Sequence, residues 1–440
     1  MALPDPLTIE PVDPFDVALR VPGSKSLTNR ALLLAALAEG ESRLTGVLFA
    51  DDSRRMIEAL QQLEVPVETD RDAATATLTG CGGSLPAGDA ELFLGNAGTA
   101  IRFLTAACCL GSGGTRGLDG IPRMRQRPIG TLVDTLRSVG GEVRYRAEAG
   151  YPPVEVEANG LFGGEILMPP TLSSQYISAL LQVGPCCEAG LTISFGGPVI
   201  SRPYVEMTVN LMRRFGAQVE VAEDFSRIRV SPGVYRALDY EIEPDASSAS
   251  YFLAAAAIVP GSRCTIEGLG SESVQGDARF AGLLGTMGAE VTLEPRRTTV
   301  AAPKQDRLQG IDADLNAMPD MAQTLAAAAV FAEGPTTIRN VGNLRVKETD
   351  RMAALQAELS KLGAEVQITG DDIHITPPPG GQIAPAAIDT YDDHRMAMSF
   401  AVIGLAAEGV SINDPGCVAK TYPDFFDHLE RLGARAGAAE

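Results

Sequence analysis

The stretch Val21-Pro-Gly-Ser-Lys-Ser26 is a Gly/Pro turn that joins a strand-like run to a helix rich in Leu and Ala, residues 30–38. Similar turns recur five more times, at residues 94–99, 168–174, 243–248, 318–321 and 391–395. The steps are 72, 75, 74, 75 and 73 residues between the markers Gly23, Gly95, Pro170, Pro244, Pro319 and Asp392. A regular period indicates a structural unit repeated six times.

Each unit continues in the same way after its turn. Several of the Ala- and Leu-rich helices, such as residues 322–332, are apolar on all sides, which predicts helices that are buried all round. Most end near a glycine, as helix C-termini commonly do: Gly40, Gly190, Gly261, Gly334 and Gly409. A strand such as 191–195, an amphipathic helix, and two alternating strands such as 364–368 and 373–376 follow.

The repeat is offset along the chain. The sixth unit breaks off at Leu432-Gly-Ala434, while strand-like runs at 7–10 and 16–20 precede the first turn. We therefore expect the first 22 residues to complete the last unit. Three units then form one domain, residues 1–22 plus 244–440, and three form the other, residues 23–243. Two chain crossings, near Pro22 and near Glu243, join these two α/β (α+β) domains.

Composition excludes several classes of protein. The chain has 36 Lys and Arg against 56 Asp and Glu, a formal charge of −20, which argues against nucleic-acid or anionic-membrane partners. The longest apolar stretch, 396–407, is shorter than the roughly 18 residues of a membrane helix. We expect no signal peptide. The seven Cys show no metal-type spacing, so we expect buried thiols and a cytoplasmic protein.

The polar residues gather where the apolar helices begin. A helix N-terminus attracts anions because its N–H groups are unpaired and its dipole is positive there. The residues at these ends are Ser24, Lys25, Ser26, Arg30, Asn96, Gly98, Thr99, Arg102, Ser173, Ser174, Gln175, Asp320, His394 and Arg395. Each has a plain alternative as a cap, a tight turn or a solvated charge. Their recurrence at matching positions of the repeat favours an anion site.

Six motifs together resemble the 5-enolpyruvylshikimate-3-phosphate synthase family. They are Pro22-Gly-Ser-Lys-Ser26, Leu94-Gly-Asn-Ala-Gly-Thr-Ala-Ile-Arg102, Pro122-Arg-Met-Arg-Gln-Arg-Pro-Ile-Gly130, Arg345-Val-Lys-Glu-Thr-Asp-Arg351, Asp393-His-Arg-Met-Ala-Met398 and Ala419-Lys-Thr-Tyr-Pro-Asp424. The resemblance implies two similar domains of three βαβαββ units each, an inside-out α/β barrel. It also implies transfer of the enolpyruvyl group of phosphoenolpyruvate to the 5-hydroxyl of shikimate 3-phosphate, in the shikimate pathway. The implied enzyme is a monomer with two small-molecule substrates and no metal or cofactor.

The same resemblance implies the site residues. Those for shikimate 3-phosphate are Lys25, Ser26, Arg30, Ser173, Ser174, Gln175, Ser201, Tyr204, Asp320, Asn343 and Lys347. Those for phosphoenolpyruvate are Lys25, Asn96, Gly98, Arg127, Gln175, Arg351, Arg395 and Lys420. For catalysis, Asp320 would accept the hydroxyl proton, Glu348 would protonate the methylene carbon, and Lys25 would assist departure of phosphate. An acid that donates at neutral pH needs a raised pKa, so we expect Glu348 to be desolvated or near another carboxylate.

Two positions depart from the family pattern. Phe103 stands where the family usually has Pro, and Leu344 where an aromatic residue is common. The first would tilt the helix that begins at Gly98 and change the phosphoenolpyruvate site. Gly98 itself is the small residue typical of members sensitive to glyphosate.

Two other functions compete with this interpretation. UDP-N-acetylglucosamine enolpyruvyl transferase shares the architecture but uses a Cys on a mobile loop, whereas residues 119–127 here contain Arg and no Cys. A non-catalytic anion-binding scaffold would not need the acid–base pair of Asp320 and Glu348.

Overall fold

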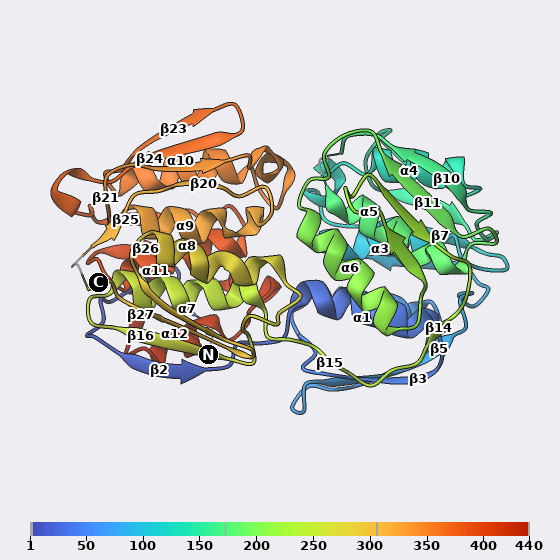
Figure 1. The fold of residues 1–440 in the computed structure, drawn as a ribbon, viewed down its shortest axis with the longest axis horizontal. Coiled ribbons are helices and arrows are strands. Elements are labelled where there is room, and N and C mark those ends of the chain that lie inside the picture. The colour runs from blue at the N-terminus through green and yellow to red at the C-terminus, as the bar shows by residue number, and fades with distance from the viewer. Residues whose placement is uncertain (1–2, 172, 305–306, 439–440) are drawn as a thin grey trace. The chain divides into compact units, whose positions relative to one another are not determined.

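The computed structural model describes residues 3–171, 173–304 and 307–438, so Leu172 of the third repeat turn lies outside the described residues. The chain forms two compact units (Figure 1): unit 1 is Met1–Pro22 with Glu243–Glu440, and unit 2 is Gly23–Ile242. The boundary differs by one residue from the one expected from the repeat. Glu243 lies in unit 1, where its carboxylate accepts hydrogen bonds from Ser273 Oγ at 2.6 Å and Gln275 Nε2 at 3.0 Å.

Unit 2 contains three sheets of one design. In spatial order they are β6 (Ala90–Phe93), β7 (Thr115–Asp119), β9 (Val154–Glu157), β8 (Glu142–Tyr145); β10 (Gly164–Met168), β11 (Leu191–Phe195), β13 (Arg227–Val230), β12 (Val219–Val221); and β14 (Tyr235–Arg236), β3 (Ala38–Thr45), β5 (Thr75–Cys81), β4 (Val67–Asp70), with β15 (Tyr240–Glu241) also pairing with β3. In each sheet the first two strands are parallel, β15 is also parallel to β3, and the other pairs are antiparallel.

Unit 1 repeats this design three times. Its sheets are β2 (Asp16–Leu19), β16 (Arg263–Glu267), β18 (Arg297–Ala301), β17 (Glu290–Glu294); β20 (Asp312–Asp314), β22 (Thr336–Arg339), β24 (Asp372–Thr376), β23 (Glu365–Thr369); and β25 (Ala386–Ile388), β26 (Val410–Ile412), β1 (Leu7–Ile9), β27 (Ala436–Ala438). A further small sheet pairs β19 (Leu308–Gln309) with β21 (Ala332–Glu333).

Each unit has an inner and an outer set of helices. The inner helices are α1 (Lys25–Leu37), α3 (Gly98–Ala107) and α5 (Ser174–Val183) in unit 2, and α7 (Ala246–Ile258), α9 (Ala322–Ala329) and α11 (His394–Gly404) in unit 1. The outer ones are α2 (Asp51–Gln62), α4 (Gly130–Ser138), α6 (Arg202–Arg214), α8 (Phe280–Thr286), α10 (Arg351–Lys361) and α12 (Phe425–Glu430). All 13 residues of α7 are buried. Helices that are apolar on every side must be enclosed on every side, which produces the inside-out arrangement.

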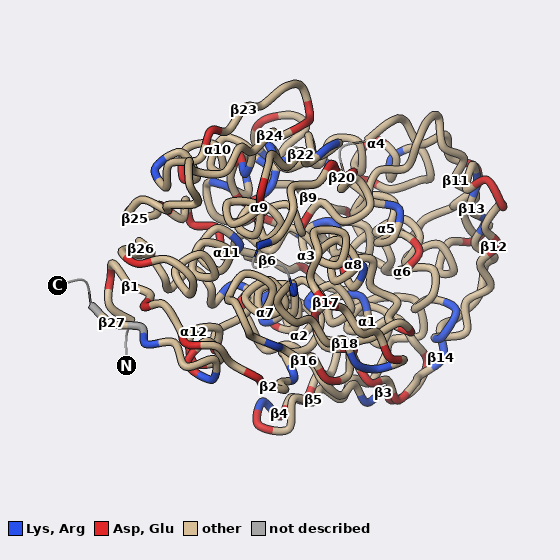
Figure 2. Tube along the Cα trace, turned by 60° about the vertical axis from the view of Figure 1, so that its left-hand side comes forward, with Lys and Arg blue, Asp and Glu red and all other residues tan. Residues whose placement is uncertain are grey.

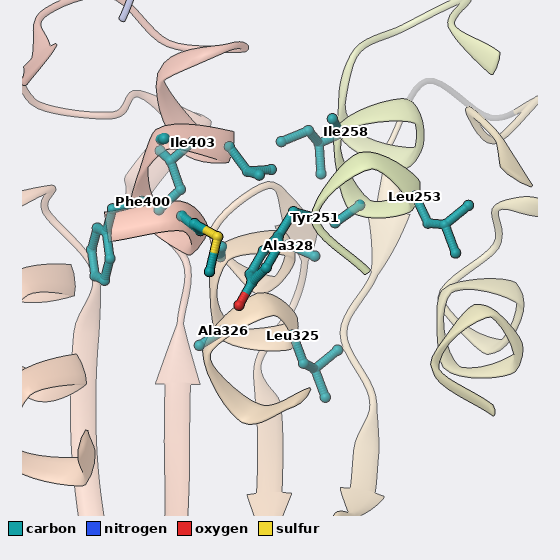
Figure 3. Packing of buried hydrophobic residues seen from close by; sticks show 14 of the residues in the cluster. Tyr251, Leu253, Ile258, Leu325, Ala326, Ala328, Phe400 and Ile403 are labelled. Carbon is teal, nitrogen blue, oxygen red and sulfur yellow. The ribbon is translucent and has the colours of Figure 1, made fainter. Parts of the chain in front are cut away.

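The core of unit 1 lies between its inner helices. Figure 3 shows Tyr251 of α7 among side chains of α9 and α11, including Leu325 and Ile403. Within the described ranges, no helix is both long and apolar enough to cross a membrane.

The expectation that both N-terminal strands complete the sixth unit was wrong for one of them. β1 does so, together with β27, but β2 pairs in parallel with β16 and opens the sheet next to α7. Conversely, β14 and β15, which precede α7 in sequence, pair with β3 beside α1. The chain crosses between the units after β2 and again after β15. β2 therefore pairs within unit 1, and β14 and β15 pair within unit 2. The amide of Asp245 donates to the Pro22 carbonyl at 2.8 Å at this point.

Gly23, the first residue of unit 2, gives a stability prediction. A Cβ atom there would lie 1.8 Å from the carbonyl oxygen of Gly46, so Gly23→Ala should reduce the free energy of unfolding by about 3 kcal/mol. The matched control is Gly282→Ala on α8, where a Cβ would have nothing within 4 Å. It should leave stability unchanged or raise it by up to about 1 kcal/mol. Thermal unfolding of both variants checks this, and equal melting temperatures would contradict it.

Candidate active site

N-terminal ends of inner helices lie together in each unit. In unit 1, Arg395 of α11 contacts Ser247 of α7 at 3.3 Å and Asp320, just before α9, at 3.0 Å. In unit 2, Gln175 of α5 donates to Thr99 of α3 at 3.3 Å. The positive ends of three helix dipoles therefore meet in unit 1, and those of α3 and α5 meet in unit 2, an arrangement suited to anions.

Arg351 is the most enclosed cation of unit 1, with its side chain 1% exposed. Its Nε and Nη2 donate to the two carboxylate oxygens of Asp393 at 2.7 and 3.1 Å. Asp393 also caps α11 by accepting from the amide of Arg395 at 2.9 Å. Burial lowers the pKa of Arg351, but the charges of Asp393, Glu348 and Asp320 outweigh it and raise that pKa. One buried carboxylate thus fixes two guanidinium-bearing residues.

Asp320 and Glu348 contact the same guanidinium. Arg351 Nη1 lies 3.2 Å from Asp320 Oδ1, and Nη2 lies 2.8 Å from Glu348 Oε2. Glu348 is 7% exposed. Lys347 Nζ lies 3.5 Å from Asp320 Oδ1. The two carboxylates predicted for acid–base work therefore share one cation, with further cations around Asp320.

Arg395 is held on several sides. Its Nη2 bridges Asp320 Oδ2 and Ser247 Oγ, while Nη1 approaches the Tyr251 hydroxyl at 3.5 Å and the Asp320 carbonyl at 3.4 Å. Burial raises the pKa of Tyr251 to about 12, although Arg395 opposes the shift. Ser247 Oγ in turn donates to Asp277 Oδ2 at 2.6 Å.

The other predicted residues of unit 1 lie in short helices. Asn343 belongs to the 3₁₀ segment Gly342–Val346 and is buried, and Lys347 directly follows that segment. Leu344, at the position where the family often has an aromatic residue, is also fully buried. Lys420 ends the segment Pro415–Lys420 and is 9% exposed.

In unit 2, Arg127 and Gly98 are brought together. Arg127 Nη1 donates to both the carbonyl and the side-chain oxygen of Asn96, each at 3.0 Å. Arg102 Nη1 donates to the Gly98 carbonyl at 2.8 Å. A Cβ atom on Gly98 would lie 2.5 Å from Arg127 Nη2 and 2.8 Å from Arg102 Nη1. Only glycine leaves these guanidinium groups where they are.

Arg30 is held in unit 2 by oxygen atoms and one ring. It donates to Thr208 Oγ1 at 2.7 Å, to the Ser26 carbonyl at 2.9 Å and to Ser178 Oγ at 3.2 Å. Its guanidinium carbon lies 5.1 Å from the centroid of the Phe103 ring. Burial lowers the pKa of Arg30 to about 10, so it stays protonated near neutral pH. Phe103 lies within a continuous α3 and packs on Arg30.

The remaining predicted residues of unit 2 lie at starts of helices. Lys25 begins α1, and its Nζ is 3.5 Å from Asp52 Oδ2. Ser26 follows it. Ser173 caps α5 by accepting from the amide of Gln175 at 3.3 Å, and Ser174 is the first residue of that helix. Ser201, in the left-handed region at φ 53°, precedes α6, which contains Tyr204.

Three residues of the unit 1 cluster were not predicted from the sequence. Asp393 stood inside a quoted motif, and its position before the Ala- and Met-rich helix could have identified it as a cap. Ser247 lay in the fourth repeat turn. Asp277 carried no repeat signal, because it lies in the 3₁₀ segment Gly276–Arg279, after the strand rather than at a repeat turn.

The arrangement can hold anions and move protons. Unit 1 places carboxylates in contact with buried guanidinium groups, and unit 2 holds three buried guanidinium groups at helix N-termini. Figure 2 shows that Lys and Arg are scattered among more numerous Asp and Glu along both units. In the described part of the chain, no three His, Cys, Asp or Glu side chains group as a metal site would require.

Comparison with known proteins identifies relatives over nearly the full chain. The sequence model described as EPSP synthase (3-phosphoshikimate 1-carboxyvinyltransferase) matches residues 9–429. The 3-phosphoshikimate 1-carboxyvinyltransferase of Marinomonas sp. (strain MWYL1) is 46% identical, covering 96% of this chain and 98% of its own. The chloroplastic enzyme of that name from Arabidopsis thaliana is 47% identical, and the match covers 97% of this chain and 84% of the Arabidopsis sequence. The solved EPSP synthase from Acinetobacter baumannii is 27% identical, with a TM-score of 0.82 and coverage of 98% and 100%.

The pair of Asp393 and Arg351 gives a second prediction. Asp393→Asn should reduce the free energy of unfolding by about 3–5 kcal/mol, because it leaves a buried guanidinium without its two-pronged partner. The matched control is Asp312→Asn, whose partner Arg339 is 51% exposed. That change should cost less than about 1 kcal/mol. Urea unfolding compares the two variants, and losses of equal size would show that burial of the pair does not matter.

Proposed function

The chain belongs to the EPSP synthase family, and from this membership we propose which of its side chains carry out the reaction. It transfers the enolpyruvyl group of phosphoenolpyruvate to the 5-hydroxyl of shikimate 3-phosphate and releases phosphate. The reaction is a step of the shikimate pathway to aromatic amino acids.

One observation supports the assignment of roles most directly. Asp320 and Glu348, the two candidate proton-transfer groups, contact opposite nitrogens of the buried Arg351 guanidinium at 3.2 and 2.8 Å. A protein that only binds anions would gain nothing from two carboxylates beside its cations, because they weaken the field on the ligand. A protein that must both remove and donate protons needs such groups in fixed positions.

The proposed reaction is an addition followed by an elimination. Asp320 accepts the proton of the 5-hydroxyl, and Glu348 donates a proton to the methylene carbon of phosphoenolpyruvate. Carbon 2 becomes cationic, the hydroxyl oxygen bonds to it, and a tetrahedral intermediate forms. The Glu348 carboxylate then takes back a methyl proton, which restores the double bond as the bond from carbon 2 to the phosphate oxygen breaks, and Lys25 stabilises the charge on the departing phosphate.

The proposed binding residues follow the charge of the substrates. For phosphoenolpyruvate we assign Arg351, Arg395 and Lys420 in unit 1, and Lys25, Asn96, Gly98, Arg127 and Gln175 in unit 2. For shikimate 3-phosphate we assign Asp320, Asn343 and Lys347 in unit 1, and Lys25, Ser26, Arg30, Ser173, Ser174, Gln175, Ser201 and Tyr204 in unit 2. Guanidinium and ammonium groups at helix N-termini match carboxylate and phosphate oxygens in charge and geometry.

The alternative acceptor, UDP-N-acetylglucosamine, is not favoured. The loop 119–127 carries Arg123, Arg125 and Arg127 where that reaction would use a Cys. Cys108 and Cys109 are fully buried in the turn after α3, and burial raises the pKa of Cys108 to about 12. We further propose a cytoplasmic monomer that acts without a metal, a cofactor, nucleic acid or a membrane. The formal charge of −20 supports the last two points.

Phosphate release tests the function. Wild-type protein with phosphoenolpyruvate should release phosphate when shikimate 3-phosphate is added and not when UDP-N-acetylglucosamine is added. Glu348→Gln keeps the shape of the side chain but has no proton to give, so kcat should fall by about 100-fold or more with a small change in KM. Release with the UDP-sugar would overturn the choice of acceptor. Folded wild-type protein that releases phosphate with neither acceptor would favour the binding scaffold.

The fit around Gly98 predicts a change in binding rather than in chemistry. Gly98→Ala would push its Cβ into Arg127 Nη2 and Arg102 Nη1, so KM for phosphoenolpyruvate should rise by about tenfold, with kcat changed less. Steady-state kinetics measures both constants. Gly282→Ala is again the control, since nothing lies near its Cβ and its KM should match the wild type. An unchanged KM in Gly98→Ala would remove Gly98 from the site.

A further inference from the structure

We propose that Asp277 is a positioning residue for Arg395 and acts through the hydroxyl of Ser247. The proposal rests on the proposed function in one respect, the assignment of Arg395 to phosphoenolpyruvate. Neither Asp277 nor Ser247 belongs to the residues assigned to substrate or to proton transfer above.

The contacts form a short relay. Asp277 Oδ2 accepts from Ser247 Oγ at 2.6 Å, and Ser247 Oγ lies 3.3 Å from Arg395 Nη2. The same Nη2 lies 3.0 Å from Asp320 Oδ2. Asp277 and Ser247 are 5% and 8% exposed, so bulk water does not replace these bonds. The relay therefore joins a buried carboxylate to the cation that contacts the proposed base.

The chemistry of the groups fixes the direction of the relay. An ionised carboxylate can only accept, so Ser247 must donate its single proton to Asp277. The lone pairs of Ser247 Oγ are then left to face Arg395, which can only donate. A neutral side chain at position 277 would remove this constraint, because the hydroxyl proton could turn towards Arg395 and oppose it. Asp277 thus keeps the lone pairs of Ser247 Oγ, and not its proton, directed at the Arg395 guanidinium.

The turn that carries Asp277 is itself firmly held. Gln275 Nε2 donates to the Pro244 carbonyl at 2.8 Å, and its Oε1 accepts from the amide of Ala246 at 3.1 Å. Glu243 accepts from Ser273 Oγ and the amide of Val274. The segment 273–277 is therefore tied to the start of α7, the helix that carries Ser247. Such support is what a positioning residue requires, because a mobile carboxylate could not orient a hydroxyl.

The negative charge on Asp277 lowers the stability of the fold. Burial, and next the charge of Asp320, raise the pKa of Asp277 to about 6, while the Ser247 hydrogen bond and Arg395 oppose the shift and Asp245 adds to it. A carboxyl group whose pKa is higher in the folded than in the unfolded state destabilises the fold above that pKa, and the loss disappears as the pH falls. Stability alone would favour a neutral side chain here. An ionised group kept at such a place indicates a functional use.

Kinetics of four variants tests the relay. Asp277→Asn and Ser247→Ala should each raise KM for phosphoenolpyruvate by about tenfold and change kcat by less than about threefold. The double variant should be no worse than Ser247→Ala, because both changes break one path. Ser247→Thr keeps the hydroxyl and should stay near the wild type. Independent, multiplying effects of the two single changes would overturn the proposal.

Thermal unfolding separates positioning from simple structural support. Asp277→Asn should raise the melting temperature at about pH 8, and the gain should shrink at about pH 5, where Asp277 is neutral in the wild type. A variant that is more stable yet binds phosphoenolpyruvate more weakly is the expected result. A purely structural Asp277 would instead lose stability and activity together. The substrate phosphates titrate in the same way in both assays. Dividing kcat/KM of the wild type by that of Asp277→Asn at each pH therefore removes their effect.

Glu358→Gln is the matched control. Glu358 is another fully buried carboxylate of unit 1, on α10, and accepts from the Tyr391 hydroxyl at 2.7 Å. Its loss should lower the melting temperature and leave KM for phosphoenolpyruvate unchanged. If Asp277→Asn behaves like this control, the relay is wrong. If the wild type releases no phosphate with either substrate pair, the proposed function fails instead, so the two failures are distinct.

Discussion

Enclosure of the six inner helices is the constraint on which the rest of the structure depends. Helices such as α7 have no polar face to offer to water, so each unit must surround three of them with three sheets. Because the inner helices begin at matching positions of the repeat, enclosure also brings their N-terminal ends together. The anion-attracting ends are thus a by-product of packing the core. The repeat then needs only to place suitable side chains in the turns.

The two units stabilise buried cations by different means. In unit 1, carboxylates hold Arg351 and Arg395, and the negative charge also supplies the candidate proton carriers. In unit 2, Arg30 is held by hydroxyl and carbonyl oxygens and by the Phe103 ring. Neutral acceptors satisfy the geometry of a guanidinium without cancelling its charge. Unit 2 therefore offers uncompensated positive charge at Arg30, whereas unit 1 offers positive charge already balanced by groups that can take part in proton transfer.

The sequence predicted the six-fold repeat and the polar residues at the starts of the inner helices, because apolar periodicity and Gly/Pro turns are local signals. The sequence did not predict the pairing of β2. No local pattern in residues 16–19 indicates that they pair with residues 263–266 rather than with the sixth unit. Asp277 was missed for a similar reason, since its importance comes from a contact with Ser247 thirty residues away. The roles of Asp320 and Glu348 came from resemblance and stay predictions, to which the structure adds that both carboxylates contact Arg351.

Strand pairing in unit 1 also sets the order in which the protein can be completed on the ribosome. β1, at residues 7–9, pairs with β26 at residues 410–412 and with β27 at residues 436–438, so it stays unpaired until those residues emerge. Unit 2 is contiguous, and its helices and strands are all available by residue 242. Unit 2 can therefore fold while β1 and β2 of unit 1 are still unpaired. Unpaired strand edges are sites for mispairing. A chaperone that binds the nascent N-terminal segment would be most valuable while β1 and β2 lack their partner strands.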